Sequence, residues 1–265
     1  MWINYKVADI TFSTNVSGFP FKSWEQFCCN EIANHNLEIL FYVNLANEVK
    51  INYDISFVQV PTTTKVLLVG ENLIFMDEKE NQSYMLLKDI KDLPVSMAYL
   101  FYTHAVRRQM IQLHCATIED QGRGILFLGP SGIGKTTQAE RWAQFRGASI
   151  INGDVGFVQR TEREYIAWGT PWHGSSPYCL NASVPVKALV VLKQAPENRL
   201  RELTGFEKVT EVSGSVFYPT WLEDGMELCT DTLNHLLTDL PVYRLDNRAD
   251  RESVEILAKE LDRIT

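Results

Sequence analysis

The sequence lacks the features that direct a chain into a membrane, out of the cell or onto nucleic acid. No apolar run approaches the roughly 20 residues that a membrane-spanning helix requires. The first residues show neither the charged segment nor the apolar segment of a signal peptide. Basic residues are in the minority, since 25 Lys and Arg against 33 Asp and Glu give a net charge of −8. We therefore expect a cytoplasmic protein that has neither a membrane nor a nucleic acid as a partner.

Cysteine is scarce and its spacing excludes the common metal and redox motifs. The five cysteines are odd in number and form no C-x-x-C pair. Two of them, Cys28 and Cys29, are adjacent, and neighbours in sequence are poor disulfide partners. The pattern predicts reduced thiols, which agrees with a cytoplasmic location.

One motif stands out from this ordinary composition. Residues 129–137 read G-P-S-G-I-G-K-T-T, a full match to the phosphate-binding loop pattern G-x-x-x-x-G-K-[ST]. An apolar run at 125–128 precedes it and an alternating polar and apolar stretch at 138–145 follows it. This order predicts a strand, a glycine loop and a helix, which is the context that the motif requires. We expect the chain to bind a nucleoside triphosphate, with ATP and GTP both open.

The chemistry of such a loop assigns a role to each residue type. Glycines let backbone N–H groups approach phosphate oxygens, and the helix N-terminus adds partial positive charge. The Lys135 ammonium is expected to reach the β- and γ-phosphates, and the Thr136 hydroxyl to ligate Mg²⁺. The candidate nucleotide-binding residues are Gly129, Ser131, Gly132, Ile133, Gly134, Lys135, Thr136 and Thr137.

The sequence also lacks the partners that accompany this loop in several large classes of nucleotide-dependent protein. The apolar run at 186–192 ends in Lys193-Gln194 and not in adjacent acids, as the corresponding strand of most fast ATPases does. Neither the N-K-x-D motif that reads guanine nor the L-S-G-G-Q transporter signature is present. These absences disfavour motor ATPases, GTPases and transporters.

The hydrophobic pattern changes near residue 95 and predicts two domains. Residues 1–93 carry β signals at 3–7, 37–45, 50–60, 66–69 and 73–75, with a short helix over 24–35. We interpret them as a β-rich, antiparallel accessory domain for docking or oligomer contact, so a homo-oligomer is possible. Residues 94–265 are expected to form the catalytic domain, and the predicted class is mixed α/β.

Within residues 94–265 we expect one helix over 95–113 before the loop and one after it, ending near Gly147. Strands are expected at 114–118, 148–151, 186–192 and 242–245, with a hairpin at 157–160 and 164–168. Apolar residues at helical spacing over 254–264 predict a final helix capped by Asp250.

Three segments together resemble a known family. They read L-H-C-A-T-I, G-I-L-F-L-G-P-S-G-I-G-K-T-T and S-I-I-N-G-D-V-G-F-V, and they are similar to the kinase core of the HPr serine kinase/phosphorylase group. That group shares its fold with phosphoenolpyruvate carboxykinases. The later segments G-T-P-W-H-G-S and P-V-K-A-L-V-V-L-K-Q resemble small HPr-kinase-like proteins associated with peptide-modification clusters. The resemblance covers roughly residues 112–205.

The resemblance implies a kinase that phosphorylates serine on a carrier protein, on a precursor peptide or as a free amino acid. It matches His114 to a histidine beside the reacting phosphate and Asp154 to the second of two adjacent aspartates. A carboxylate there can take the proton of an attacking hydroxyl or bind Mg²⁺. The resemblance thus implies Asp154, His114 and Lys135 as catalytic residues, and Thr136 and Asp154 as metal ligands.

The sequence departs from that family at Gly153, where the first aspartate is usual. It also lacks the glycine- and arginine-containing signature that supports the reverse reaction in the carrier-protein kinases, which disfavours HPr as a substrate. Trp172 and His173 are open to two interpretations, a wall of an acceptor pocket or a structural Pro-Trp corner. Phe217, Tyr218 and Trp221 are expected to pack in a core.

Our hypothesis is an ATP- and Mg²⁺-dependent kinase acting on a hydroxyl, that of serine in a small molecule, a peptide or a carrier protein. Two alternatives remain open: a nucleotide-binding regulator or scaffold without kinase activity, which Gly153 favours, and a slow ATPase coupled to a partner.

Overall fold

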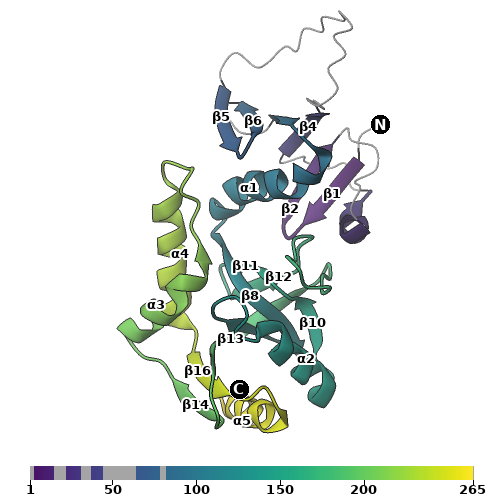
Figure 1. The fold of residues 1–265 in the computed structure, drawn as a ribbon. Helices are drawn as coiled ribbons and strands as arrows, with labels where there is room; N and C mark the ends of the chain where they lie inside the picture. Colours follow the sequence, from purple (N-terminus) through teal and green to yellow (C-terminus); the bar gives the residue numbers. More distant parts are fainter. Residues whose placement is uncertain (1–2, 15–21, 31–36, 44–63, 78–81, 265) are drawn as a thin grey trace, which may run out of the picture. The chain divides into compact units, whose positions relative to one another are not determined.

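The computed structural model describes residues 3–14, 22–30, 37–43, 64–77 and 82–264 (Figure 1). The chain divides into two compact units, Met1–Tyr102 and Thr103–Thr265. The predicted boundary after residue 93 lies at the start of helix α1 (Leu93–Val106), whereas the division between the units falls later in this helix, between Tyr102 and Thr103. Helices and sheets are combined along the chain, which confirms the mixed α/β class. No helix in the described ranges is long and apolar enough to cross a membrane.

The first unit is built on a seven-stranded sheet in the order β3-β1-β2-β4-β7-β6-β5. Its strands are β1 (Ile3–Val7), β2 (Ile10–Thr14), β3 (Cys28–Cys29), β4 (Leu37–Val43), β5 (Thr64–Val69), β6 (Asn72–Asp77) and β7 (Gln82–Leu87). The β-rich prediction is confirmed, but the antiparallel arrangement is wrong, because β4 runs parallel to both β2 and β7. Parallel neighbours require long connections, which a strand's own alternation does not reveal.

The helix expected over residues 24–35 is wrong in its extent. A 3-10 helix covers Lys22–Phe27 and gives way at once to β3, and residues 31–36 lie outside the described ranges. Its Trp24 ring packs edge-on against Tyr5 and Phe12 and closes a small aromatic core. The strand predicted over 50–60 also lies outside the described residues.

The second unit holds a nine-stranded sheet whose main path is β10-β8-β11-β12-β13-β16-β14. Strand β9 pairs with β8 and β13, and β15 pairs with β8. The strands are β8 (Met110–Asp120), β9 (Arg123–Leu128), β10 (Ser149–Asn152), β11 (Val155–Arg160), β12 (Tyr165–Trp168), β13 (Ser183–Gln194), β14 (Arg199–Glu202), β15 (Val216–Phe217) and β16 (Val242–Asn247). The helices are α2 (Lys135–Arg146), α3 (Phe206–Val212), α4 (Gly225–Asp239) and α5 (Arg251–Arg263), with a short 3-10 turn at Ser213–Ser215; another 3-10 turn, Ile90–Asp92, lies in the first unit just before α1.

Several predicted elements of this unit are confirmed and one is wrong. The hairpin β11–β12, the buried strand β13 and the final helix with its Asp250 cap are as expected. The helix predicted over 95–113 is wrong beyond Val106, because the chain turns there and Met110 already begins β8. An apolar run does not by itself distinguish a buried strand from a buried helix.

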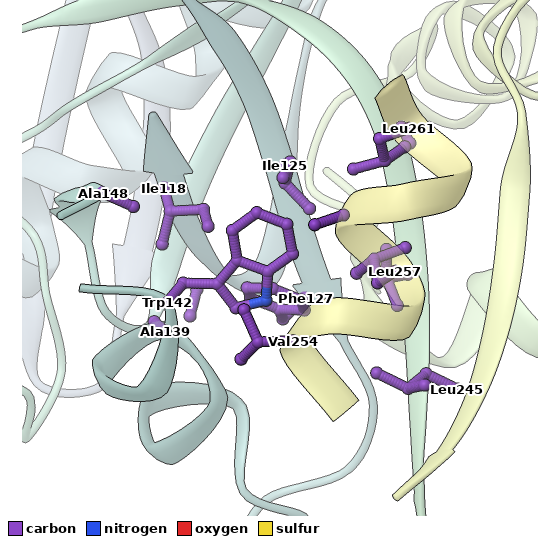
Figure 2. Packing of buried hydrophobic residues seen from close by; sticks show 14 of the residues in the cluster. Ile118, Ile125, Phe127, Ala139, Trp142, Ala148, Leu245, Val254, Leu257 and Leu261 are labelled. Carbon is purple, nitrogen blue, oxygen red and sulfur yellow. The ribbon is translucent and has the colours of Figure 1, made fainter. Parts of the chain in front are cut away.

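Helices α2 and α5 cover one part of this sheet (Figure 2). Trp142 of α2 lies within the cluster, with its ring centroid 6.3 Å from that of Phe127 on β9. Leu257 and Leu261 of α5 and Ile118 of β8 complete the same buried cluster. Because β9, β13 and β16 are parallel, their carboxyl ends meet at one edge of the sheet, which is where ligands bind in open α/β sheets.

Candidate functional site

The phosphate loop joins β9 to α2, as its motif predicts. Gly129, Gly132 and Gly134 have φ values of 136°, 77° and 107°, a region that side chains rarely adopt. A Cβ atom added at Gly132 or Gly134 would meet nothing within 4 Å, and no side chain of the N-cap residue bonds to the first turn of α2. The loop therefore has open space and uncapped helix N–H groups where a phosphate would bind, and its residues fit a triphosphate.

Lys135 is the most enclosed polar residue of this loop. Its side chain is buried, and its Nζ donates to the carbonyl oxygens of Gly129 at 3.1 Å and Pro130 at 3.3 Å. Burial lowers the pKa of the Lys135 ammonium, and the nearby charge of Asp154 opposes that shift. Of the other predicted loop residues, Ser131 and Thr137 are exposed, and Ile133 packs against the buried cluster.

His114 and Asp154, forty residues apart in sequence, lie together. His114 Nε2 is 2.9 Å from Asp154 Oδ1, and both side chains are partly buried, with exposures of 24% and 32%. With the carboxylate ionised, His114 donates this hydrogen bond from Nε2. The sequence prediction that both residues belong to one site agrees with this contact, while their catalytic roles remain a prediction.

Strand β8 explains why these two residues meet. On one edge of β8 the partner is β11 up to His114 and β10 from Thr117 onward. The Gly153–Asp154 turn connects β10 to β11 and therefore lies opposite this change of partner. The Cys115 N–H donates to the Asp154 carbonyl at 3.1 Å and fixes the turn beside His114.

Gly153 connects this turn to the phosphate loop. The Thr136 hydroxyl donates to the Gly153 carbonyl oxygen at 3.0 Å. A Cβ atom added at Gly153 would lie 1.8 Å from Ser176 Oγ and 2.6 Å from Ser176 Cβ. The buried Ser176 thus fills the space that an aspartate at position 153 would need, which gives a packing reason for the departure at Gly153.

Asn152 holds the same turn against the loop at residues 170–176. It is fully buried, and its Oδ1 accepts hydrogen bonds from the Asp154 and Val155 N–H groups at 3.0 and 2.9 Å. Its Nδ2 donates to the carbonyl oxygens of Thr170 at 3.3 Å and Trp172 at 2.8 Å. One amide side chain therefore satisfies four backbone groups around Asp154.

The loop beyond Asn152 lies directly against the Asp154 carboxylate. A Cβ atom added at Gly174 would lie 1.9 Å from Asp154 Oδ2. Trp172 is buried and packs at 6.1 Å from Phe157, which favours the structural interpretation of this residue. His173 donates from Nδ1 to the Ser176 carbonyl and so stabilises its own turn.

The expectation that Phe217 packs in the core is wrong. Its side chain is 46% exposed, and its ring centroid lies 6.3 Å from that of His114. Strand β15 is only two residues long and borders β8, so the ring stands at the surface beside the histidine. An aromatic residue in a short apolar run gives no sequence signal of such exposure.

Sequence reasoning also missed three polar residues around the phosphate loop and its neighbouring turn. Asn152 and Ser176 act as described, and Ser215 Oγ accepts a hydrogen bond from the Gly129 N–H at 3.3 Å. Ser215 lies 86 residues after Gly129, and Ser176 lies in a different segment of the chain from Gly153. No local motif marks such contacts, because long-range packing creates them.

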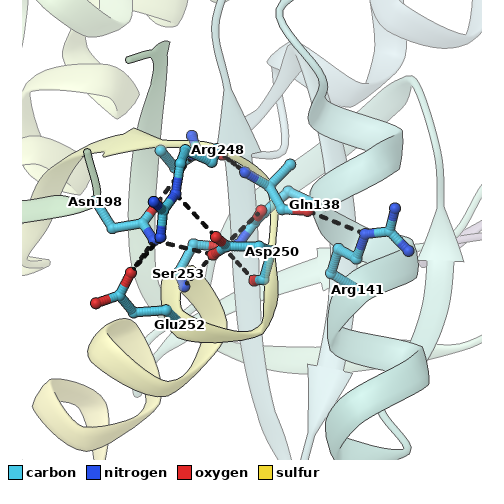
Figure 3. Close-up of polar contacts among 9 residues, drawn as sticks. Gln138, Arg141, Asn198, Arg248, Asp250, Glu252 and Ser253 are labelled. Carbon is cyan, nitrogen blue, oxygen red and sulfur yellow. Dashed lines mark hydrogen bonds and ion pairs between the residues drawn. The ribbon is translucent and has the colours of Figure 1, made fainter. Parts of the chain in front are cut away.

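Helix α2 is braced at its outer side by the N-terminus of α5 (Figure 3). Buried Gln138 and Ser253 exchange hydrogen bonds at 3.2 and 3.3 Å, and Arg141 donates to the Ala249 carbonyl at 3.0 Å. Asp250 accepts from the Ser253 N–H and caps α5. These contacts fix the helix whose first turn forms the end of the phosphate loop.

The strand beside the phosphate-loop strand carries no acid at its end. β13 pairs directly with β9, with Val191 opposite Leu128. It ends at Gln194, whose Nε2 lies 3.5 and 3.4 Å from the carbonyl oxygens of Gly132 and Ile133. Gln194 therefore supports the loop backbone at the position where fast ATPases have a carboxylate.

The cysteine beside His114 is a buried thiol. All five cysteines are free thiols, and burial raises the pKa of Cys115, the closest in sequence to His114, to about 11. Among the residues that the structure describes, no three or more His, Cys, Asp and Glu side chains form a metal-binding group. A cation at this site would therefore depend on a few protein oxygens together with those of its ligand.

Comparison with known proteins gives a family and a distant structural likeness. The family model described as ScmC, SynChlorMet cassette protein ScmC, matches residues 77–245. The HPr(Ser) kinase/phosphatase from Coxiella burnetii shares 12% identity and a TM-score of 0.34, covering 57% of this chain and 88% of that chain. A likeness at this TM-score is too distant to support a function. No curated protein matches the chain.

Proposed function

We propose that this chain, which belongs to the family of SynChlorMet cassette protein ScmC, is an ATP- and Mg²⁺-dependent kinase that transfers the γ-phosphate to a hydroxyl. The acceptor is a serine of a peptide or carrier protein, or serine as a small molecule. The observation that carries the proposal is the Asp154–His114 pair at 2.9 Å, joined through Gly153 to Thr136 of the phosphate loop. The proposed kinase core is of the HPr serine kinase/phosphorylase type, which the sequence resembles.

The phosphate loop forms the donor half of the site. Its N–H groups, the start of α2 and the Lys135 ammonium bind and neutralise the triphosphate. The Thr136 hydroxyl donates its proton to the Gly153 carbonyl, so its lone pairs stay available to a cation. Thr136 and Asp154 would hold Mg²⁺, which supplies charge neutralisation on the phosphate oxygens.

The Asp154–His114 pair forms the acceptor half. The acceptor oxygen attacks the γ-phosphorus and a new P–O bond forms. The bond from that phosphorus to the bridging oxygen breaks, and its electron pair leaves with ADP. The hydroxyl proton passes to the Asp154 carboxylate. His114 keeps this carboxylate oriented by donating to Oδ1, so catalysis depends on positioning and electrostatics.

One observation favours the second candidate, a nucleotide-binding regulator without kinase activity. Ser176 fills the space beside Gly153, so a second carboxylate cannot stand there without moving the loop. A single acid would then serve both as metal ligand and as base. In such a regulator the phosphate loop would bind nucleotide, and the Asp154 turn would couple binding to shape or assembly.

The test is a transfer assay with the purified chain, Mg²⁺ and ATP labelled in the γ-phosphate. Free serine, serine-containing peptides and carrier proteins are the acceptors, and labelled product is separated from free phosphate. The kinase proposal expects label on an acceptor. Nucleotide binding without transfer or release supports the regulator, and labelled phosphate formed at the same rate with and without every acceptor supports a slow ATPase.

A further inference from the structure

An exposed aromatic ring, that of Phe217, lies on the same face of the sheet as His114 of the Asp154–His114 pair. Phe217 in β15 stands opposite Gln112 of β8, and residues directly opposite in an antiparallel pair point to the same face. Gln112 and His114 are two residues apart on one strand and share that face as well. The Phe217 and His114 rings are accordingly 6.3 Å apart and tilted by 55°.

The other side of this face is bordered by the loop at residues 170–176. In β11, Val155 stands opposite His114 and Phe157 opposite Gln112, so their side chains point the same way. Trp172 packs on Phe157, and Gly174 lies against the Asp154 carboxylate. The pair is therefore bordered by Phe217 on the β15 side and by this loop on the β11 side.

The segment that carries Phe217 is attached to the phosphate loop. Ser215, two residues earlier, is buried and accepts a hydrogen bond from the Gly129 N–H at 3.3 Å. Its neighbour Val216 is buried and pairs with Leu113 of β8. The strand is thus fixed at both the donor loop and β8, which holds the ring at a set position relative to both halves of the site.

We infer that Phe217 is the specificity-determining wall of the acceptor site, selecting a peptide whose serine or threonine has an aromatic or aliphatic neighbour. This inference rests on the proposed kinase function. The Phe217 ring is 46% exposed, and covering it with an apolar group lowers the free energy of the complex because apolar surface leaves the water. A peptide side chain next to the hydroxyl supplies such a group. Free serine brings two charges and no apolar side chain, and its carboxylate would approach the like charge of Asp154.

The experiment compares short peptides in which a central serine is flanked by Leu or Phe with matched peptides flanked by Gly, both acetylated and amidated. Phosphate transfer from γ-labelled ATP gives kcat/KM, and fluorescence anisotropy with a non-hydrolysable ATP analogue gives the Kd of the same peptides. The variants are Phe217→Ala, the conservative Phe217→Leu, and Phe206→Ala as a control. Phe206 is a matched control because it is 77% exposed and lies at the start of α3.

For the wild type and Phe206→Ala we expect the apolar-flanked peptides to be favoured by about tenfold in both kcat/KM and Kd. Phe217→Ala should abolish this preference, and Phe217→Leu should retain part of it. Equal preference in Phe217→Ala and wild type, or free serine as good an acceptor as the apolar-flanked peptide, would overturn the inference. Transfer to no acceptor, with nucleotide bound, would instead overturn the proposed function, and the anisotropy data would still show whether Phe217 selects peptides.

Discussion

The phosphate loop and the Gly153–Asp154 turn both depend on glycine, but for different physical reasons. Gly132 and Gly134 have positive φ and open space where a side chain would be. Gly153 has no such φ, and a Cβ atom there would collide with Ser176. The first region needs glycine for its backbone conformation, whereas the second needs it for close packing within the protein.

This difference shows which half of the site a sequence motif can describe. The loop is built from nine consecutive residues, so its pattern is local and its conformation follows from them. The turn is set by Asn152, by Ser176 and by His114, which come from three separate segments. Its geometry depends on contacts across the sheet, and these appear only when the chain is folded.

The largest expected effect comes from removing the Lys135 ammonium from the phosphate loop. Lys135→Ala should lower phosphate transfer by about a thousandfold, because the developing charge on the phosphate oxygens loses its closest cation. The free energy of unfolding has to be measured alongside, because the variant also loses the hydrogen bonds from Lys135 Nζ to the Gly129 and Pro130 carbonyl oxygens. Transfer assays and urea denaturation measure the two quantities, and transfer near the wild-type rate would contradict the role of Lys135.

A change at Gly153, which packs against Ser176, should instead lower the stability of the fold. Gly153→Ala is expected to lower the free energy of unfolding by about 1–3 kcal/mol, as overpacking does, because the new methyl group meets Ser176. Adding Ser176→Gly should restore most of the loss, since it removes both the Oγ and the Cβ atom. Ser176→Ala is the matched control and should not restore it, because its Cβ atom stays 2.6 Å from the new group. Urea denaturation of the wild type and these three variants would show no rescue if the collision is not the cause.

A smaller loss of stability should follow from an alanine at Gly132 in the phosphate loop. Gly132→Ala is expected to cost about 1 kcal/mol, because its φ of 77° is unfavourable for a side chain although nothing is in contact. Ser176→Gly should leave this loss unchanged, in contrast to its effect on Gly153→Ala. Nucleotide affinity should also fall, as measured by calorimetry. Rescue by Ser176→Gly would contradict the distinction between the two regions.

Sequence patterns were sufficient where structure is local. The phosphate loop, the β11–β12 hairpin and α5 with its Asp250 cap follow from motif, alternation and periodicity. The helix predicted over 95–113 is wrong at 107–109, because the three polar residues there fit the exposed side of a helix as well as they fit the turn that the structure shows, in which Gln109 has a φ of 54°. The exposure of Phe217 and the fourfold role of Asn152 were not predictable, since each depends on the register of strands distant in sequence.

The central claim is that Asp154 is needed for phosphate transfer itself, beyond any share it has in holding Mg²⁺ and the nucleotide. Asp154→Asn keeps the shape of the side chain and an oxygen that accepts from His114, so the turn should stay folded. The most direct measurement is of ATP affinity and of γ-phosphate transfer on this variant alongside wild type. The account predicts affinity within a few-fold of wild type and transfer reduced by about a hundredfold or more. Transfer at the wild-type rate would contradict it.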